Sequence, residues 1–445
     1  MITQITPNVV SLASKTTTKE EWIFRIAIVA GLALTLIAVS YCCRKSNSKT
    51  YTYTPIRTEK SRSDSVASES AEASQVKQIL DACLTGNIDD LKQVLSNISD
   101  VNTFLTTDDL GRQAVYDACA AGSAACIQEL INRVSDPNTI LGPLLNQQTG
   151  LHPACCKGHI ECVKLLLQNG SEITKDINTG WTPLHYACKH GHIDCAKALI
   201  EGSTNMESLV NAKTRTGETA LHLASVNNQI ESVALLLEID ELSILKNDDG
   251  ETALHYACKA GRSDVVATLI ASTFFDDLNI EDNDGYTALH TACSEGHVNC
   301  IETILQTAPD LIAVKDAQGN TPLHLAVAGA CSECVKTVLE HSDDPEGLIR
   351  EVNSKGDTPL HIACRQMDST TTLDLLLADG TWEHSTSESH TRNTAEELLK
   401  FIKSKDIFEM KDKSGCTPLE LSKLYLYKDE AENPVRQKYL SLHGA

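Results

Sequence analysis

The sequence is poor in aromatic residues and in basic residues, and it has only one long apolar run. Aromatic residues make up 4% of the 445 residues, whereas 42% are hydrophobic and 22% are charged. This balance excludes a disordered chain, a membrane protein with many spans and a collagen-like fibre. Lys and Arg number 38 against 60 Asp and Glu, a net charge of −22. The deficit of positive charge argues against a nucleic-acid-binding protein that relies on phosphate contacts.

The motifs of common enzyme classes are also absent. The chain contains no G-x-S-x-G, Walker, kinase or H-E-x-x-H string, and it lacks the D-H-H-C motif of an acyltransferase. Paired carboxylates such as Asp248-Asp249 fall where turns are expected, and Asp is common in turns because its side chain hydrogen-bonds local backbone. Since no nucleophile or base stands out, we expect no enzyme activity, no catalytic residue and no cofactor.

The long apolar run lies near the N-terminus. Residues 26–43 carry no charge, and the preceding segment 22–25, with its single Arg25, extends the run to 22 residues. A helix of that length is about 33 Å long, which is enough to cross the hydrocarbon core of a bilayer. A secretory signal peptide is the alternative, but its apolar core is usually only about 7–15 residues long and ends at a small-residue cleavage site. We therefore predict an uncleaved transmembrane helix over residues 22–45 after a short non-cytoplasmic tail, 1–21.

Basic residues set the expected orientation of that helix. Six Lys and Arg residues follow it between Arg44 and Arg62, whereas three precede or enter it. The excess after the helix predicts that the long C-terminal part faces the cytoplasm. Residues 46–75 are rich in Ser and Thr, which is typical of a flexible stalk. Cys42 and Cys43 lie at the expected membrane edge, where they are either sites of reversible acylation or simply the end of the span.

The rest of the chain repeats a short motif. Thr182-Pro183-Leu184-His185 belongs to a series of related strings that begin at Thr149, Thr182, Thr219, Thr252, Thr287, Thr321, Thr358 and Thr417, at spacings of 33, 37, 33, 35, 34, 37 and 59 residues. Thr is a favoured N-cap residue, and Pro is favoured at the first helical position. A Gly two residues before most of these Thr residues supplies the positive φ of a tight turn. Each unit is therefore predicted to be a turn followed by a helix.

This period of about 33 residues with a T-P-L-H string resembles the ankyrin repeat, whose unit is a β-turn and two antiparallel helices. Two earlier segments, 79–95 and 115–131, keep the Ala-Cys and Gly landmarks without T-P-L-H. The resemblance implies an all-α ankyrin-repeat solenoid of about ten repeats over residues 76–425, with atypical terminal repeats. The long last spacing indicates a polar insertion around 381–394, and residues 426–445 are expected to form a C-terminal cap or tail.

Seventeen cysteines stand out in so long a chain. Three units share a C-x3-H-x2-C pattern, beginning at Cys155, Cys188 and Cys293, and thiolates and imidazoles are ligands that zinc prefers. The first Cys, however, falls where the repeat family usually carries a core Ala, and units that lack the His or the second Cys also have it. Free cysteine behaves as a small buried hydrophobe. We therefore interpret most cysteines as core residues, predict no metal site and expect a reducing compartment.

The resemblance also implies a binding surface. Ankyrin arrays bind partner proteins along a concave face made of turn tips and the exposed side of the first helix. The matching tip positions are Trp181, Glu218, Asp248, Asp249, Glu251, Asp284, Tyr286 and Gln318, and the matching first-helix positions are Lys189, His190, Asn227, Lys259 and Glu295. Trp181 and Tyr286 are the expected anchors, because aromatic residues dominate interface energies when buried. Alternatively, these two side chains only shield neighbouring turns.

Charge is divided between the two parts of the chain. Residues 1–75 hold 9 Lys and Arg against 6 Asp and Glu, a charge of +3, and residues 76–445 hold 29 against 54, a charge of −25. An acidic array favours a basic protein or peptide as partner, or merely keeps a long solenoid soluble. We therefore predict a single-pass membrane scaffold or adaptor that binds proteins, with no nucleic-acid partner and no evident small-molecule substrate. The alternatives are an exported effector of an intracellular microbe, and a metal-binding or catalytic protein that uses the C-x3-H-x2-C sites.

Overall fold

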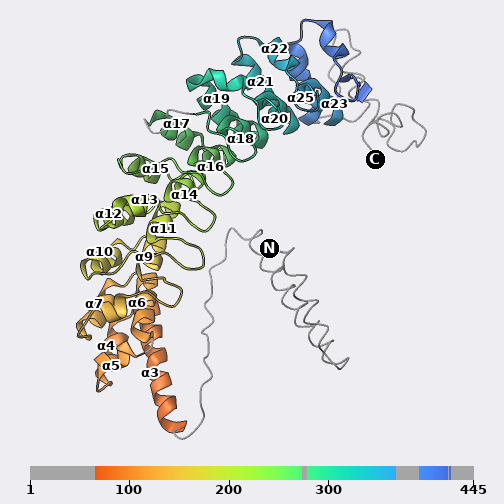
Figure 1. Cartoon of the computed structure of the whole chain (residues 1–445). Coiled ribbons are helices and arrows are strands. Elements are labelled where there is room, and N and C mark those ends of the chain that lie inside the picture. Colours follow the sequence, from red (N-terminus) through yellow and green to blue (C-terminus); the bar gives the residue numbers. More distant parts are fainter. Residues whose placement is uncertain (1–65, 108, 273–277, 367–389, 419, 422–445) are drawn as a thin grey trace, which may run out of the picture. The chain divides into compact units, whose positions relative to one another are not determined.

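A computed structural model describes residues 66–107, 109–272, 278–366, 390–418 and 420–421 (Figure 1). From Ala67 onward these residues belong to one unit. Their regular structure is entirely helical, without a β-strand in the described ranges, so the predicted all-α fold is confirmed there. The predicted tail, the transmembrane helix over 22–45 and most of the stalk lie outside the described residues. None of the described helices is long and apolar enough to span a bilayer.

The repeats form two rows of helices, and along the chain a helix of the first row alternates with a helix of the second row (Figure 1). The first helices of the repeats are α3 (Val66–Thr85), α6 (Leu110–Ala121), α9 (Leu151–Lys157), α11 (Pro183–His190), α14 (Ala220–Val226), α16 (Ala253–Lys259), α18 (Ala288–Glu295), α20 (Pro322–Ala328) and α23 (Pro359–Gln366). The second helices are α4 (Ile88–Ser96), α7 (Ala124–Asn132), α10 (Ile160–Gln168), α12 (Ile193–Glu201), α15 (Ile230–Leu237), α17 (Ser263–Ala271), α19 (Val298–Thr307), α21 (Ser332–Glu340) and α25 (His390–Lys400). From α9 onward, each helix contacts its neighbours in the same row and its partner in the other row, as α11 contacts α9, α14 and α12.

The repeated Thr and His residues start the first helices. In α11 the Thr182 side chain and the His185 imidazole form a capping box, and equivalent boxes begin α14, α16, α18 and α20. The His Nδ1 accepts the Thr backbone N–H at 3.1 Å in α11. Because Nδ1 accepts, Nε2 carries the proton, and in α14 it donates to the carbonyl oxygen of Glu251 in the next repeat at 3.1 Å. One imidazole thus starts its own helix and ties it to the next repeat.

A Gly in the left-handed region ends several first helices. Gly158, with φ of +75°, caps α9. A Cβ placed there would lie 2.6 Å from Nδ1 of His192, because the His192 ring of the next repeat packs directly over this Gly. The same arrangement joins Gly122 to His159 and Gly261 to His297. The Gly therefore serves both the chain reversal and the close approach of the next repeat.

Short helices explain the uneven spacing of the motif. They follow second helices and are α5 (Val101–Thr106), α8 (Asn138–Leu141), α13 (Met206–Val210), α22 (Pro345–Arg350) and the 3-10 helices η3 (Pro309–Ala313) and η4 (Lys405–Glu409). Helices α13 and α22 lie in the two intervals of 37 residues between successive motifs. The extra residues of those intervals thus form a helical turn outside the two rows.

Two segment boundaries differ from the expected ones. Helix α3 begins at Val66, so the last ten residues of the predicted stalk, 66–75, are helical. In the last long interval, α25 contacts both α23 and α21, which is the place of a second helix. Residues 390–394 of the predicted insertion around 381–394 belong to that helix, which begins at His390. Residues 381–389 and the predicted C-terminal cap or tail, 426–445, lie outside the described residues.

Most cysteines lie in the core, as predicted. The recurring positions are almost completely buried, for example Cys155 and Cys258 in first helices and Cys195 and Cys300 in second helices. Burial raises the pKa of the Cys155 thiol well above its usual value. The structure differs from the prediction at one pair: Cys331 and Cys334 form a disulfide. Their spacing at the start of α21 places the two Cα atoms 5.2 Å apart, within disulfide range.

Candidate functional site

The turns that precede the first helices form a ladder of fingers. In each finger an Asp, Asn or Thr side chain accepts nearby backbone N–H groups, as Asp316 Oδ1 does from Gln318 and Asn320 at 2.9 and 2.7 Å. Each finger also bonds the next one through the backbone. The Arg215 N–H donates to Thr179 O at 3.0 Å, and the Asn283 N–H donates to Asp249 O at 3.0 Å. The predicted tip residues are therefore mounted on a hydrogen-bonded support rather than on independent loops.

Trp181 sits at the centre of an aromatic cluster. Its ring is half-buried, with the Tyr186 ring centroid 4.9 Å away and the His185 centroid 6.3 Å away. The Lys189 ammonium lies 4.8 Å from the Trp181 ring centroid, within range of a cation–π interaction. The structure thus brings together two predicted residues, Trp181 of the finger and Lys189 of α11. A large aromatic surface with a positive neighbour suits an apolar or acidic partner side chain.

A second group of predicted residues forms a polar network. The Tyr256 hydroxyl donates to Glu218 Oε1 at 2.9 Å, and Asn247 Nδ2 donates to Tyr256 Oη at 3.1 Å and to Glu251 Oε2 at 3.0 Å. Lys259 Nζ completes the network by donating to Glu251 Oε1 at 2.8 Å. The network joins the fingers of two adjacent repeats to helix α16.

Glu251 lies deeper than a contact residue at a finger tip would. It was predicted to face a partner, but only 8% of its surface is exposed. Burial raises the pKa of Glu251, but the hydrogen bonds from Lys259 and Asn247 and the charge of Lys259 outweigh burial, so the pKa lies below its usual value. Its bond with Glu251 in turn raises the pKa of Lys259. Glu251 therefore holds Lys259 and Asn247 in place. It was expected at an exposed finger tip, but its side chain is buried.

The other predicted residues are distributed along the same surface. His190, Asp248, Asp249, Asp284, Glu295 and Gln318 are exposed, and Asn227 and Tyr286 are half-buried. The Tyr286 ring stacks on His290 with 5.9 Å between centroids. Asn227 ends α14, where its Nδ2 donates to Leu223 O at 2.8 Å. No structural observation tests whether these residues contact a partner, so their binding role stays a prediction.

Tyr186 and Tyr256 are the residues that the sequence analysis missed. Each follows the motif His directly, in the string H-Y-A-C, and lies on the exposed edge of its first helix between the finger and the helix surface. Tyr186 supports Trp181, and Tyr256 anchors Glu218. The signal was available, since a large polar aromatic residue next to a core Ala-Cys pair repeats at the same register in two units.

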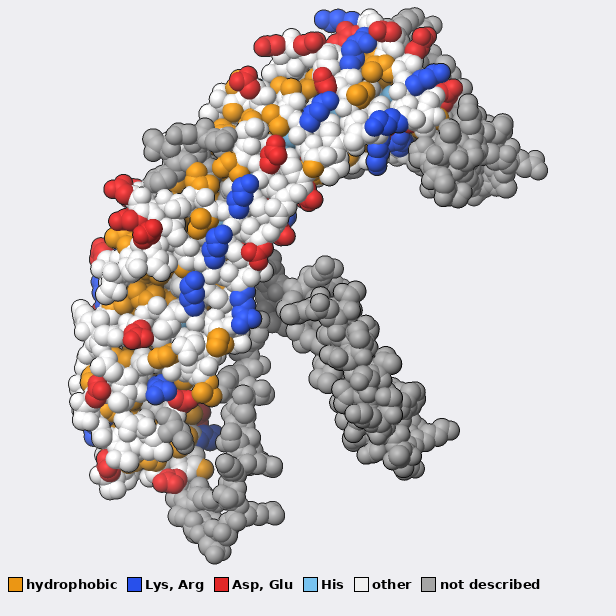
Figure 2. Space-filling view, viewed as in Figure 1, with side chains coloured by type: hydrophobic (Ala, Val, Ile, Leu, Met, Phe, Trp, Pro, Cys, Tyr) orange, Lys and Arg blue, Asp and Glu red, His pale blue; other side chains and the backbone are white. Residues whose placement is uncertain are grey.

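Basic side chains interrupt the acidic surface. Lys175, Lys213, Lys246 and Lys315 each precede a finger, and each donates its ammonium to a backbone carbonyl of the following repeat at 2.6–3.4 Å. On the face in Figure 2, Lys and Arg side chains follow one another over successive repeats. The net charge of the array is therefore not spread evenly over its surface.

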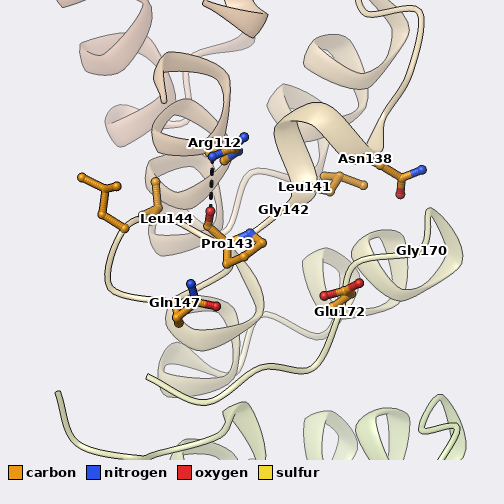
Figure 3. A pocket seen from close by; sticks show the side chains of 10 residues that line it. Arg112, Asn138, Leu141, Gly142, Pro143, Leu144, Gln147, Gly170 and Glu172 are labelled. Carbon is orange, nitrogen blue, oxygen red and sulfur yellow. Dashed lines mark hydrogen bonds between the residues drawn. The ribbon is translucent and has the colours of Figure 1, made fainter. Parts of the chain in front are cut away.

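A hollow of about 550 Å³ lies beside the loop after α8, away from the predicted residues (Figure 3). Arg112 reaches into its wall, where it donates to Pro143 O at 3.5 Å and pairs with Asp109. Leu145 in this loop is 87% exposed. In this loop Gln147, with φ of +63°, takes the left-handed conformation. Arg112 and Glu172 are the charged lining residues, and the lining contains no Ser, Thr, Cys, Lys or His.

The Cys and His residues of the C-x3-H-x2-C pattern make contacts in different places. Cys155 and Cys162 are buried in the core, whereas the intervening His159 packs over Gly122 of the preceding repeat. His192 and His297 likewise bond carbonyl oxygens of preceding repeats, Cys156 O and Lys259 O, at 3.2 Å. Within the described residues, no three His, Cys, Asp or Glu side chains come together in a way that could hold a metal ion.

The geometry defines a class of repeat protein, in which helical hairpins stack side by side and a finger turn joins each pair to the next. A family model described as ankyrin repeats (3 copies) matches residues 79–177, 174–245, 238–313 and 310–386. Because these matches cover more than half of the chain, the chain belongs to the ankyrin-repeat family. Among solved structures it is similar to the crystal structure of the human ASB11 ankyrin repeat domain, with 25% identity, coverage of 51% of this chain and 97% of that chain, and a TM-score of 0.42. A search of curated protein sequences finds no match.

Proposed function

We propose that this protein is a membrane-anchored scaffold that binds partner proteins along its finger tips and first helices. The observation that carries the proposal is the Trp181 cluster. A half-buried indole, backed by Tyr186 and Lys189, sits on a finger that is hydrogen-bonded to the next finger. A rigid aromatic residue of this kind loses little conformational freedom on binding, which favours an interface hot spot.

The array supplies the remaining area. With about ten repeats, each unit adds a finger tip and a helix edge to one continuous surface. Exposed carboxylates at Asp248, Asp249 and Asp284 favour a basic partner segment, whereas Glu251 contributes through Lys259. A stoichiometric binding role needs no catalytic group.

Membrane anchoring rests on the sequence. The apolar run 26–43 and the basic residues that follow it support one span over 22–45 with the array facing the cytoplasm. Anchoring would raise the effective concentration of the array toward partners at the same membrane. The test is alkaline extraction of membranes that contain the full chain or a form without residues 22–45. The full chain should resist extraction and the shortened form should not, and equal extraction of both would contradict anchoring.

Replacing both anchor residues tests the binding face. Proximity labelling from the membrane-bound chain should recover a set of partners that the W181A/Y286A variant loses, while its helical circular dichroism stays unchanged. The matched control is K197A/E302A, which alters exposed residues of the second helices α12 and α19. If the W181A/Y286A variant labels the same proteins as the unchanged chain, this face is not the binding surface.

A further inference from the structure

One cysteine pair differs in chemistry from the other described cysteines. Cys331 and Cys334 form a disulfide, whereas the remaining cysteines of the described residues are free and mostly buried. The pair flanks Ser332 and Glu333 at the start of α21, where Cys331 is the N-cap residue. The Cys334 backbone N–H points at Cys331 Sγ over 3.2 Å.

Comparison with the other repeats shows how the pair arises. Cys334 occupies the buried second-helix position that holds Cys162, Cys195 and Cys300 elsewhere. Cys331 occupies the position of the His that packs over the preceding Gly, and Gly296 accordingly has Cys331 as its nearest neighbour. One change of residue type, from His to Cys, therefore places a second sulfur next to a core thiol.

The two sulfurs have unequal surroundings. Cys331 is partly exposed, whereas Cys334 is completely buried. Cys331 also lies at the N-terminal end of a nine-residue helix, where unpaired N–H groups and the helix dipole favour a thiolate. The deeply buried thiols elsewhere lack these features, and burial raises the pKa of Cys119 and Cys258 well above the usual value.

We propose that Cys331 and Cys334 form a thiol–disulfide exchange site whose co-substrate is a low-molecular-weight disulfide such as oxidised glutathione. The Cys331 thiolate attacks one sulfur of the co-substrate, forms a mixed disulfide and releases one thiolate. The Cys334 thiolate then attacks the Cys331 sulfur, closes the protein disulfide and releases the second thiolate. The two protein thiols lose two electrons and two protons, and the co-substrate becomes two thiols.

The exchange alters a contact between repeats. Cys331 Sγ lies 3.9 Å from Gly296 O of the preceding repeat, so the thiol of the dithiol state is placed to donate a hydrogen bond to that oxygen. In the disulfide state Cys331 has no hydrogen to donate, so this bond is lost. At other junctions the residue at the Cys331 position is a His or an Arg, which bonds a carbonyl near the end of the preceding first helix, as His297 bonds Lys259 O and Arg262 bonds Val226 O. Those bonds do not depend on redox state. The site therefore couples the thiol–disulfide balance to the junction between α18 and α21.

The test uses the purified full chain in glutathione buffers that run from fully reduced to fully oxidised. After acid quenching and alkylation, mass spectrometry of the peptide that contains residues 331–334 should show reversible conversion between dithiol and disulfide, with the other cysteines remaining thiols. The C334A variant should accumulate one glutathione on Cys331. The C331S variant keeps a good N-cap residue and should accumulate none on Cys334. The C300A variant is the matched control and should leave the exchange unchanged.

Three results would overturn the proposal. The pair could remain in one state across all the buffers, the C334A variant could carry no adduct, or the adduct could form on Cys334 of the C331S variant. Amide hydrogen exchange reports separately on the junction, where the residues around Gly296 should exchange faster in the disulfide state. Equal exchange in both states would contradict the coupling. None of these readouts depends on the proposed partner binding.

Discussion

At the residue scale, the motif His is the most informative side chain. Its Nδ1 accepts the backbone N–H of the Thr three residues earlier, and in the repeats from α14 onward its Nε2 donates to the next repeat, as from His255 to Tyr286 O at 2.9 Å. The buried Nε2 atoms of His152 and His185 have no such partner. The acceptor role of Nδ1 requires the neutral imidazole, because both nitrogens of the charged ring carry a proton. Burial lowers the pKa of His152, His185 and His324 to about 4. The array is therefore built on imidazoles that must stay uncharged.

Acid should destabilise the array through these imidazoles. Below the ordinary His pKa of about 6.5, these imidazoles bind protons in the unfolded chain but stay neutral in the folded chain. The free energy of unfolding therefore falls as the pH drops from about 6.5 to 4. Each such His removes about 1 kcal/mol per pH unit in that window. Urea unfolding followed by circular dichroism at several pH values measures the slope.

The H185Q variant isolates one of these residues. Gln at this position can complete the capping box, as Glu420 does with the Thr417 N–H at 2.9 Å. The variant should therefore fold at neutral pH and lose stability less steeply in acid. A slope identical to that of the unchanged chain would show that His185 does not contribute.

Gly158 tests the close approach of neighbouring repeats. In the G158A variant the Ala adopts a strained left-handed conformation, and its Cβ lies 2.6 Å from His192 Nδ1. We therefore expect the free energy of unfolding to fall by about 2–3 kcal/mol. The matched control is G296A, which has a similar φ of +80° but nothing nearer than 3.8 Å to its Cβ. It should lose only about 1 kcal/mol. Equal losses in chemical denaturation would mean that the imidazole moves aside without cost.

At the element scale, a finger turn leads directly into the N-terminal end of each first helix. Lys189 and Lys259 occupy the same position near the end of α11 and α16, but they have different partners. Lys189 lies over Trp181, whereas Lys259 pairs with the buried carboxylate of Glu251. Replacing Lys189 therefore tests partner binding, whereas replacing Lys259 tests the stability of the finger.

The K259A variant should lower the free energy of unfolding by about 1–2 kcal/mol, because it leaves Glu251 buried without its charged donor. The K189A variant should change stability by less than about 0.5 kcal/mol but weaken partner capture. Thermal or urea unfolding of the two variants in parallel checks this. A K259A variant as stable as K189A would show that Glu251 finds another donor.

The elements differ in how well the sequence predicts them. The T-P-L-H string predicts the start of each first helix because Thr and His act locally, within four residues. Helices α13 and α22 were not predicted. They lie in the longer intervals between motifs, where no repeated string marks a helix start. The Cys331–Cys334 disulfide was missed because each Cys fits a separate register position. Only the folded helix start brings the two sulfurs together.

At the scale of the whole molecule, the period of the motif was sufficient to predict an all-helical ankyrin-repeat array. The candidate surface was predicted less completely. Sequence register assigned Trp181 to a finger tip and Lys189 to a first helix, and the structure shows these two side chains in contact. Register could not show that Glu251 folds inward onto Lys259 or that Tyr186 supports Trp181. Those arrangements depend on side-chain contacts between a finger and a helix, which register alone does not specify.

The central claim is that partners bind the fingers and first helices. The direct measurement is site-specific photo-crosslinking from the full chain, with a photoreactive amino acid at Glu295 or Gln318 on this face and at Lys197 or Glu302 on the second helices. All four positions are exposed. We expect discrete crosslinked partners from Glu295 and Gln318 and none from Lys197 and Glu302. Crosslinks that form mainly from the second helices would contradict it.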